Sequence, residues 1–262
     1  MYYLNDELKS SWQDQNPFTL LKTLDGKVYR EIAGRRTFRF ELNGKSYFAK
    51  LHGGVGWGEI IKNLLQLRLP VVSARNEWQA IRHLEHIGVA TMTIAGYGIT
   101  GINPATVTSF IVTEALQPTV SLEDYCRGWK TQPPAFAIKL RLLREIASIS
   151  GKLHRSGLCH RDYYLCHFLM HETPESPSMR LSVIDLHRAL IKRRLATRWT
   201  IKDIAGLYYS AMNLGLSQRD LLRFVRGYEQ APLREVFSTR ATFWTAVAGR
   251  ATAMYNKLGP VI

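Results

Sequence analysis

The chain contains few cysteines and no long apolar runs. Only Cys126, Cys159 and Cys166 occur among 262 residues. An odd number of cysteines without the spacing of a disulfide framework indicates free thiols in a reducing compartment. No stretch approaches the roughly 20 apolar residues that a membrane-spanning helix requires. The sequence therefore argues against both a disulfide-stapled secreted domain and a transmembrane helix.

The first residues, MYYLNDELKSSW, also lack the pattern of a secretory signal. They carry two acids early, and no apolar run leads to a small-residue cleavage site. We therefore expect a cytoplasmic protein.

The chain has far fewer acidic residues than basic residues. The chain has 21 Asp and Glu against 35 Lys and Arg, a formal net charge of +14. Such an excess calls for an anionic partner: nucleic acid, a phospholipid surface, an acidic protein or a substrate that carries phosphate. Because no nucleic-acid-binding module and no basic stripe interleaved with aromatic residues is present, we expect no nucleic acid partner.

The first half alternates short strand patterns with one helix. After an irregular start through Phe18, the runs KVYREIA, TFRFEL and KSYFAKLH predict three antiparallel strands, with a turn at 34–37 and a hairpin at Asn43-Gly44. Residues 73–88 have helical periodicity, and two further strands follow around 91–99 and 106–116. We expect a small lobe over residues 1–116, with a mobile insertion at 53–72 that includes a short basic helix from Gly58 to Leu67.

The second half, residues 117–262, is mainly helical. A short helix opens at Ser121, and a long amphipathic helix runs from Pro134 to Gly157. A last helix is expected from about Leu233 to Lys257. These patterns together predict an α+β protein with two lobes.

Two carboxylates in the second half have the spacing of a phosphoryl-transfer site. Asp162 ends the tripeptide His-Arg-Asp in HRDYYLCHFLM, and Asp185 ends the apolar strand LSVI. Lys50 on the third strand and Glu77 on the next helix precede them in the required order. One carboxylate can accept or position the attacking hydroxyl, and the other can hold magnesium. Each residue alone also has an ordinary structural explanation: a surface ion pair, a loop cap or a strand-end turn.

The joint arrangement resembles the protein-kinase-like superfamily and, within it, the lipopolysaccharide core heptose kinases. The residues that carry the resemblance span most of the chain: Phe48-Ala49-Lys50-Leu51-His52, Gly56-Trp57-Gly58-Glu59, Arg68-Leu69-Pro70, Asn76-Glu77-Trp78, His160-Arg161-Asp162-Tyr163-Tyr164, Cys166-His167-Phe168-Leu169 and Ile184-Asp185-Leu186-His187-Arg188. The resemblance implies a two-lobed kinase-like fold. It also implies transfer of the γ-phosphate of ATP to the first heptose of the inner core, at the cytoplasmic membrane face.

The same resemblance assigns a role to each candidate residue. Asp162 is expected beside the sugar hydroxyl, and Asp185 is expected to bind Mg²⁺. The remaining expected contacts are those of ATP: Lys50 on the α- and β-phosphates, Glu77 orienting Lys50, Gly34, Arg35 and Arg36 in the nucleotide turn, and the backbone from Glu114 to Leu116 at the adenine.

Three features depart from protein kinases. His167 replaces the asparagine of H-R-D-x-x-x-x-N, so it is a candidate second metal ligand, although Mg²⁺ prefers oxygen. Asp185-Leu186-His187 replaces Asp-Phe-Gly, and no Ala-Pro-Glu motif follows. The glycines at 53, 54, 56 and 58 follow the lysine strand, whereas a kinase glycine loop precedes it. These departures favour a small-molecule or glycolipid acceptor.

Several partners and alternatives follow. The basic side chains Lys192, Arg193, Arg194 and Arg198 lie close after Asp185 and suit an anionic inner-core glycolipid. The net charge suits an anionic membrane surface, and the resemblance allows acyl carrier protein as an acidic partner. The alternatives are a kinase for Kdo, for another small sugar or for an antibiotic, and a basic pseudokinase scaffold without catalysis.

Overall fold

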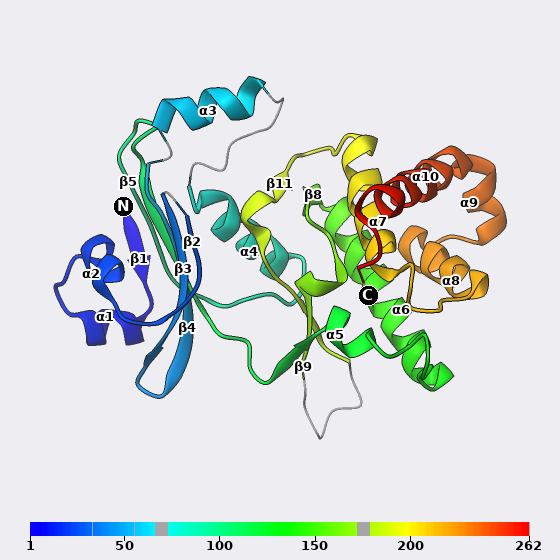
Figure 1. The fold of residues 1–262 in the computed structure, drawn as a ribbon, viewed down its shortest axis with the longest axis horizontal. Coiled ribbons are helices and arrows are strands. Elements are labelled where there is room, and N and C mark those ends of the chain that lie inside the picture. Colours follow the sequence, from blue (N-terminus) through cyan, green and yellow to red (C-terminus); the bar gives the residue numbers. More distant parts are fainter. Residues whose placement is uncertain (33, 55, 66–72, 172–178, 262) are drawn as a thin grey trace. The chain divides into compact units, whose positions relative to one another are not determined.

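A computed structural model describes residues 1–32, 34–54, 56–65, 73–171 and 179–261. The chain forms two compact units. The first comprises Met1–Arg82, Met92–Leu116 and Leu186–Arg188, and the second comprises His83–Thr91, Gln117–Asp185 and Ala189–Ile262. The expected α+β class, with a mainly antiparallel sheet and a helical second half, is confirmed (Figure 1).

The first unit is built on a six-stranded antiparallel sheet with the order β1-β5-β6-β4-β3-β2. The strands are β1 (Tyr2–Leu4), β2 (Lys27–Ile32), β3 (Arg35–Leu42), β4 (Lys45–His52), β5 (Ile94–Thr100) and β6 (Thr108–Glu114). The hairpin expected at Asn43-Gly44 joins β3 to β4, and both residues have positive φ, +50° and +76°. That conformation matches the strand twist, and asparagine and glycine tolerate it well.

Two short helices correct the expectation of an irregular start. Helix α1 (Asp6–Trp12) begins after Asn5, whose side chain accepts the amide of Leu8. Helix α2 (Pro17–Thr23) begins after Asn16 in the same way, with proline in its first turn. Helices this short are marginal alone, so sequence periodicity did not reveal them.

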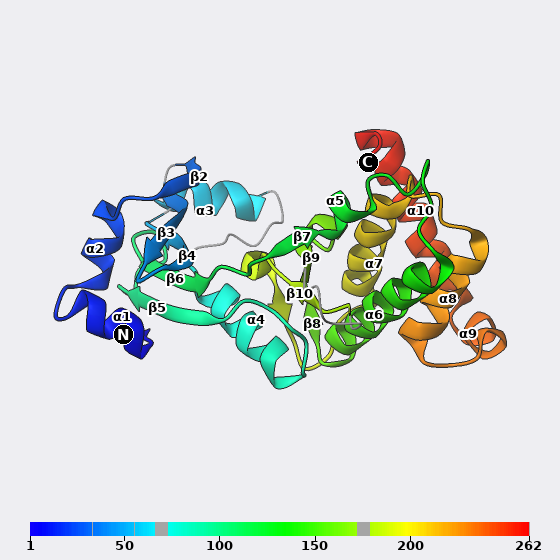
Figure 2. The same ribbon diagram turned by 90° about the horizontal axis from the view of Figure 1, so that it is seen from below.

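Packing on the sheet stabilises these two helices. Leu8, Trp12 and Leu21 are buried in one cluster with Phe38 and Phe40 of β3. The helices lie beside the sheet in both views (Figures 1 and 2). They and β1 complete a first unit that the sequence had predicted with only five strands and one main helix.

The turn between β2 and β3 is tighter than expected. Arg35, Arg36 and Thr37 belong to β3 and pair with His52, Leu51 and Lys50. Only residues 33 and 34 lie outside the strands, and residue 33 is not among the described residues. The expected turn at 34–37 is therefore wrong by about three residues, because the strand pairing extends farther than the β-propensity of arginine suggested.

Helices α3 and α4 follow β4. The structure gives α3 as Gly56–Leu65, so it begins two residues earlier than expected, while residues 66–72 of the expected insertion lie outside the described residues. Helix α4 (Arg75–His86) begins after Ser73, whose hydroxyl accepts the amide of Arg75 at 3.3 Å, and Gly88 follows it with φ +67°. Gly88 ends the helix in the conformation that glycine favours, and the carbonyl of Ala74, one residue after Ser73, accepts the first helical amides.

The second unit packs helices around short strand pairs. Its strands are β7 (Thr119–Ser121), β8 (Leu158–Cys159), β9 (Phe168–His171), β10 (Leu181–Val183) and β11 (Leu190–Ile191), in sheets ordered β10-β9-β7 and β11-β8. Its helices are α5 (Leu122–Cys126), α6 (Phe136–Arg155), α7 (Thr197–Ala211), α8 (Gln218–Glu229), α9 (Leu233–Thr239) and α10 (Ala241–Leu258). Helix α10 packs on α7, and α8 packs on α6 (Figure 2).

The expected single last helix is wrong, because the chain breaks at Arg240 between α9 and α10. Arg240 has φ −128°, outside the helical range, and its guanidinium forms an ion pair with Glu229 at 2.8 Å. The three cysteines are free, as expected, and Cys126 and Cys159 are buried. No helix within the described ranges is long and apolar enough to cross a membrane.

Candidate active site

Lys50 and Glu77 form a tight ion pair in the first unit. Lys50 lies on β4 and Glu77 in the first turn of α4, and Nζ and Oε1 are 2.6 Å apart. The side chain of Glu77 is 1% exposed and that of Lys50 is 16% exposed. An ion pair shielded from water in this way holds the ammonium in one place more firmly than a surface pair would.

The strand register decides which arginine shares a face with Lys50. Thr37 lies opposite Lys50 and Arg35 opposite His52, so Arg35 and Lys50 lie on one face of the sheet. Arg36 is on the other face, where its guanidinium donates to the carbonyl oxygens of Lys22 and Leu24 at 3.0 and 3.3 Å. The structure therefore brings Arg35 to the Lys50 face and leaves the Arg36 side chain on the face that packs on α2.

Gly34 and the glycines after β4 approach each other closely. The amide of Gly53 donates to the carbonyl of Gly34 at 2.7 Å, and Gly34 has φ +75°. A Cβ on Gly54 would collide with the carbonyl oxygen of Ala105. Glycines 53 and 54 thus allow backbone segments to touch, which sequence reasoning missed when it treated them as part of a mobile insertion.

His52 contributes a buried imidazole to the Lys50 face. It is 2% exposed, and burial, with added repulsion from Arg35, Lys50 and His187, lowers its pKa to about 3. The imidazole is therefore neutral at physiological pH.

The adenine-contact candidates lie at the end of β6. Glu114 is its last residue, and its amide donates to the carbonyl of Thr93 at 2.9 Å. The amide of Ala115 donates to the carbonyl of Ser46, and Leu116 is the last residue of this segment in the first unit.

The loop that carries Asp162 is anchored by a residue that sequence reasoning missed, Asp203 of α7. One carboxylate oxygen of Asp203 accepts the amide of His160 at 2.6 Å, and the other accepts the amide of Arg161 at 2.8 Å. His154 of α6 lies 3.3 Å from the same carboxylate. Burial acts to raise the pKa of Asp203, but the contact with His154 and the charges around it leave that pKa below its usual value. The available signal was a single acid inside the apolar helical run TIKDIAGL.

Asp162, His167 and Asp185 come together in the second unit. His167 Nδ1 lies 2.6 Å from the main-chain oxygen of Asp162, and His167 Nε2 lies 3.7 Å from Asp185 Oδ2. Asp185 has φ +59°, an uncommon conformation for a residue other than glycine. Within the described ranges no group of three or more His, Cys, Asp or Glu residues is arranged to hold a metal. A cation here would take a carboxylate and an imidazole from the protein and its other ligands from elsewhere.

A basic and aromatic cluster follows Asp185 in the second unit. The guanidinium carbons of Arg161 and Arg198 lie 5.3 and 5.2 Å from the ring centre of Trp199. The other basic side chains noted in the sequence, Lys192, Arg193 and Arg194, are exposed in the segment between β11 and α7. Arg161 directly precedes Asp162, so positive charge lies next to the candidate catalytic residue.

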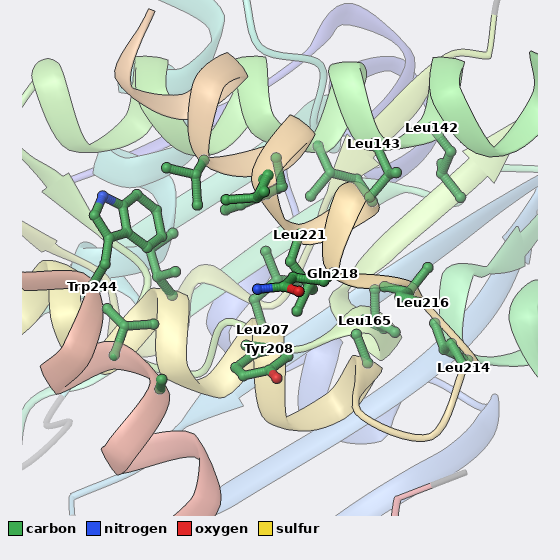
Figure 3. Close-up of a pocket in the computed structure, with 18 of the residues that line it drawn as sticks. Leu142, Leu143, Leu165, Leu207, Tyr208, Leu214, Leu216, Gln218, Leu221 and Trp244 are labelled. Atoms are coloured by element: carbon green, nitrogen blue, oxygen red, sulfur yellow. The ribbon is translucent and has the colours of Figure 1, made fainter. Parts of the chain in front are cut away.

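The second unit also contains an apolar cavity of about 360 Å³. Its lining comes from α6, α7, α8 and α10, and Figure 3 shows Leu143, Leu207 and Leu221 converging on it with Trp244 at one end. Leu165, three residues after Asp162, also lines it. The volume lies within the range of small-molecule binding sites. The sequence showed only amphipathic helices. Their pattern predicts a packed apolar core, but it does not predict a cavity within that core.

Comparison with known proteins identifies the family. Residues 20–228 match the model described as the lipopolysaccharide kinase (Kdo/WaaP) family. The lipopolysaccharide core heptose(I) kinase WaaP of Pseudomonas aeruginosa is 48% identical over 97% of this chain and 96% of its own length, and that of Escherichia coli is 46% identical over 98% of each. A solved structure of WaaP in complex with acyl carrier protein has a TM-score of 0.85 and 43% identity, covering 97% of this chain and 99% of that one. This chain therefore belongs to the lipopolysaccharide kinase (Kdo/WaaP) family.

Proposed function

We propose that this protein is an ATP-dependent kinase that phosphorylates a hydroxyl of the first heptose in the inner core of lipopolysaccharide. The observation that carries the proposal is the near full-length similarity to two proteins named as heptose(I) kinases. Within this chain, a buried Lys50–Glu77 pair and an anchored loop with Asp162 agree with that chemistry.

Lys50 holds the α- and β-phosphates of ATP, and Glu77 orients Lys50. A shielded ammonium stabilises phosphate charge with little reorganisation. Gly34 in the turn and Arg35, at the start of β3 and on the Lys50 face, support the phosphates, while the backbone from Glu114 to Leu116 contacts the adenine. Arg36 is not part of this set, since its side chain binds carbonyl groups beside α2.

Asp162 positions the sugar hydroxyl for in-line attack and accepts its proton as the hydroxyl oxygen bonds to the γ-phosphorus and the bond from that phosphorus to the bridging oxygen of ADP breaks. Phosphoryl transfer passes through a loose transition state, so alignment contributes more than early proton removal. The anchoring of His160 and Arg161 by Asp203 fixes the backbone that presents this carboxylate.

Asp185 and His167 are the residues that would hold a divalent cation. The donor set fits, because a carboxylate oxygen and an imidazole nitrogen face each other at 3.7 Å. A cation held there would supply positive charge to stabilise the phosphate groups during transfer. Residues 1–116 accordingly form the nucleotide-binding part, and residues 117–262 form the catalytic and acceptor-binding part.

The acceptor is anionic, and the cluster of Arg161, Arg198 and Trp199 suits it. Guanidinium groups bind carboxylates and phosphates in a bidentate manner, and an indole ring packs on the apolar face of a sugar. The exposed side chains at 192–194 extend this positive surface.

Acyl carrier protein is the proposed protein partner. The similar solved structure is a complex with it, and an acidic partner complements the net charge of +14. The apolar cavity suits the acyl chain that such a carrier bears. Ala248 at the rim of the cavity allows a test: Ala248→Trp is expected to weaken binding of acylated carrier protein, while Ala246→Trp, on the same helix but away from the cavity, is not. Equal binding by both variants contradicts this role of the cavity.

Attachment to the inner face of the cytoplasmic membrane is also proposed. Each basic residue near an anionic surface contributes about 1 kcal/mol. Trp57, Ile61 and Leu65 recur every four residues on α3 and are all exposed, a pattern typical of a helix that lies on a bilayer. Trp57→Ser is expected to lower the fraction of protein that floats with anionic vesicles. Ile102→Ser, at another exposed apolar residue, is expected to leave that fraction unchanged.

Transfer of labelled phosphate from ATP to phosphatase-treated inner-core glycolipid tests the main proposal. The wild-type protein is expected to label the first heptose, as mass spectrometry of the product can locate it. Asp162→Asn and Asp185→Asn are expected to lose at least about 100-fold in rate, and the exposed Asp14→Asn serves as control. Folded Asp162 and Asp185 variants with normal rates, or labelling of Kdo or a free sugar instead, would contradict it.

A further inference from the structure

The ring of His167 is fixed by its surroundings. Its Nδ1 lies 2.6 Å from the main-chain oxygen of Asp162, and because a carbonyl only accepts, Nδ1 carries the proton and donates. The ring of His160 stacks on it, with centroids 5.6 Å apart and an interplanar angle of 18°. The main chain is held as well, since the carbonyl of His167 accepts the amide of Ile184 at 3.0 Å.

This arrangement leaves the other ring nitrogen of His167 beside Asp185. Nε2 is thus the ring nitrogen that can bind a cation, and it lies 3.7 Å from Asp185 Oδ2. That separation exceeds a hydrogen bond. Two ligand atoms that are each about 2.1 Å from one ion lie no more than about 4.2 Å apart, so these two atoms are close enough to contact the same cation.

The types of donor atom then bear on the identity of the cation. Mg²⁺ strongly prefers oxygen ligands and releases its water reluctantly. An imidazole nitrogen favours divalent ions of the first transition series. The described ranges contain no larger cluster of ligating side chains. The imidazole nitrogen is therefore one of few protein ligand atoms at this site, and nucleotide phosphates and water would complete the coordination.

We propose that His167 makes this site selective for a divalent transition-metal ion, such as Mn²⁺, over Mg²⁺. The inference rests on the proposed function, in which Asp185 is a metal ligand. An asparagine at position 167 would offer an amide oxygen to the cation. The imidazole nitrogen of His167 is therefore the group that shifts the preference away from Mg²⁺. The hydrogen bond from Nδ1 to Asp162 orients the ring, as outer partners of ligating histidines commonly do.

Metal competition with matched variants tests the selectivity. Free Mn²⁺ is measured by electron paramagnetic resonance with the full chain and a non-hydrolysable ATP analogue, while Mg²⁺ is added. The ratio of the Mg²⁺ to the Mn²⁺ dissociation constant is expected to fall about tenfold in His167→Asn. It is expected to stay unchanged in His171→Asn, whose ring instead contacts Ser182 at 2.8 Å. An unchanged ratio in a folded His167→Asn variant overturns the inference.

A second measurement needs no variant. Pulsed electron paramagnetic resonance of Mn²⁺ bound to the wild-type protein is expected to show coupling to an imidazole nitrogen, which changes when histidine is labelled with ¹⁵N. Absence of that coupling overturns the inference. If phosphate transfer still occurs in that case, the proposed kinase stands. Conversely, nitrogen coupling and Mn²⁺ selectivity without phosphate transfer under either metal contradict the proposed function and leave the metal preference in place.

Discussion

The carboxylate of Asp203 accepts the main-chain amide of His160 at 2.6 Å, which ties the middle of α7 to the backbone before Asp162. The same carboxylate accepts the next amide, that of Arg161, whose φ is +73°. An uncommon backbone conformation persists only where its surroundings hold it. Asp203 therefore helps to determine the local shape of the loop before Asp162.

Replacing Asp203 by Asn is expected to reduce both activity and stability. An amide has one oxygen, so one of the two main-chain donors would face an NH₂ group and lose its acceptor. Leaving a buried donor unsatisfied costs about 1–3 kcal/mol, and the displaced loop lowers kcat more than it raises the KM for ATP. Urea unfolding and steady-state kinetics measure the two effects.

Asp14→Asn is the matched control for Asp203, because Asp14 is exposed. It is expected to change stability and kcat little. An Asp203→Asn protein with wild-type stability and kcat would show that the two amide contacts do not hold the loop.

The Lys50–Glu77 pair is expected to act as a unit in catalysis. Lys50→Ala should lower kcat/KM for ATP about 100-fold or more, since it removes a positive charge from the phosphates. Adding Glu77→Ala to that variant should change little, because in the proposed mechanism Glu77 acts by orienting Lys50. A double-mutant cycle on kcat/KM measures the coupling.

Lys45 and Glu7 provide a matched pair within the same unit. Their ion pair also has a length of 2.6 Å, but Lys45 is 60% exposed. Lys45→Ala is expected to leave kcat/KM within about twofold of wild type, since exposed pairs contribute little. Similar losses in Lys45→Ala and Lys50→Ala would argue against a specific role for Lys50.

Local signals explain what the sequence could predict. The hairpin at Asn43-Gly44, the capped start of α4 and the placement of Lys50 near the end of a strand each depend on a few neighbouring residues. Asp162, His167 and Asp185 could also be picked out as candidates from the sequence, because all three follow short strands or turns in one segment.

Features that depend on distant packing were not predicted. Helices α1 and α2 are too short to form alone, and they are stabilised by contacts with β3 and β4. Asp203 lies about forty residues from the amides that it binds. The cavity results from how α6, α7, α8 and α10 pack, so no single helix reveals it. Arg36 was expected in the nucleotide turn, but strand pairing includes it in β3, where neighbouring side chains point to opposite faces of the sheet.

Gly54 is expected to be required because a side chain at this position would collide with a neighbouring backbone segment, and not because the chain must be flexible there. In Gly54→Ala the new methyl group would meet the carbonyl oxygen of Ala105, so the free energy of unfolding should fall by about 1–3 kcal/mol. Gly58→Ala, within α3 and with open space around it, should instead raise it by about 0.5–1 kcal/mol. Urea midpoints compare the two. Equal effects would indicate that the glycines act only through chain flexibility.

His52 is expected to make the folded protein sensitive to acid. Its pKa of about 3 when folded lies below the ordinary 6.5, so on acidification the unfolded chain binds a proton that the folded chain excludes. The contribution of His52 is thus fully present above pH 6.5 and is lost as the pH falls toward 3, by about 2 kcal/mol at pH 5. Because glutamine stays neutral, His52→Gln should lose less stability than wild type between pH 7 and pH 5 in urea titrations. His86→Gln, at an exposed site, should follow the wild-type curve, and identical losses in all three proteins would show that His52 titrates normally.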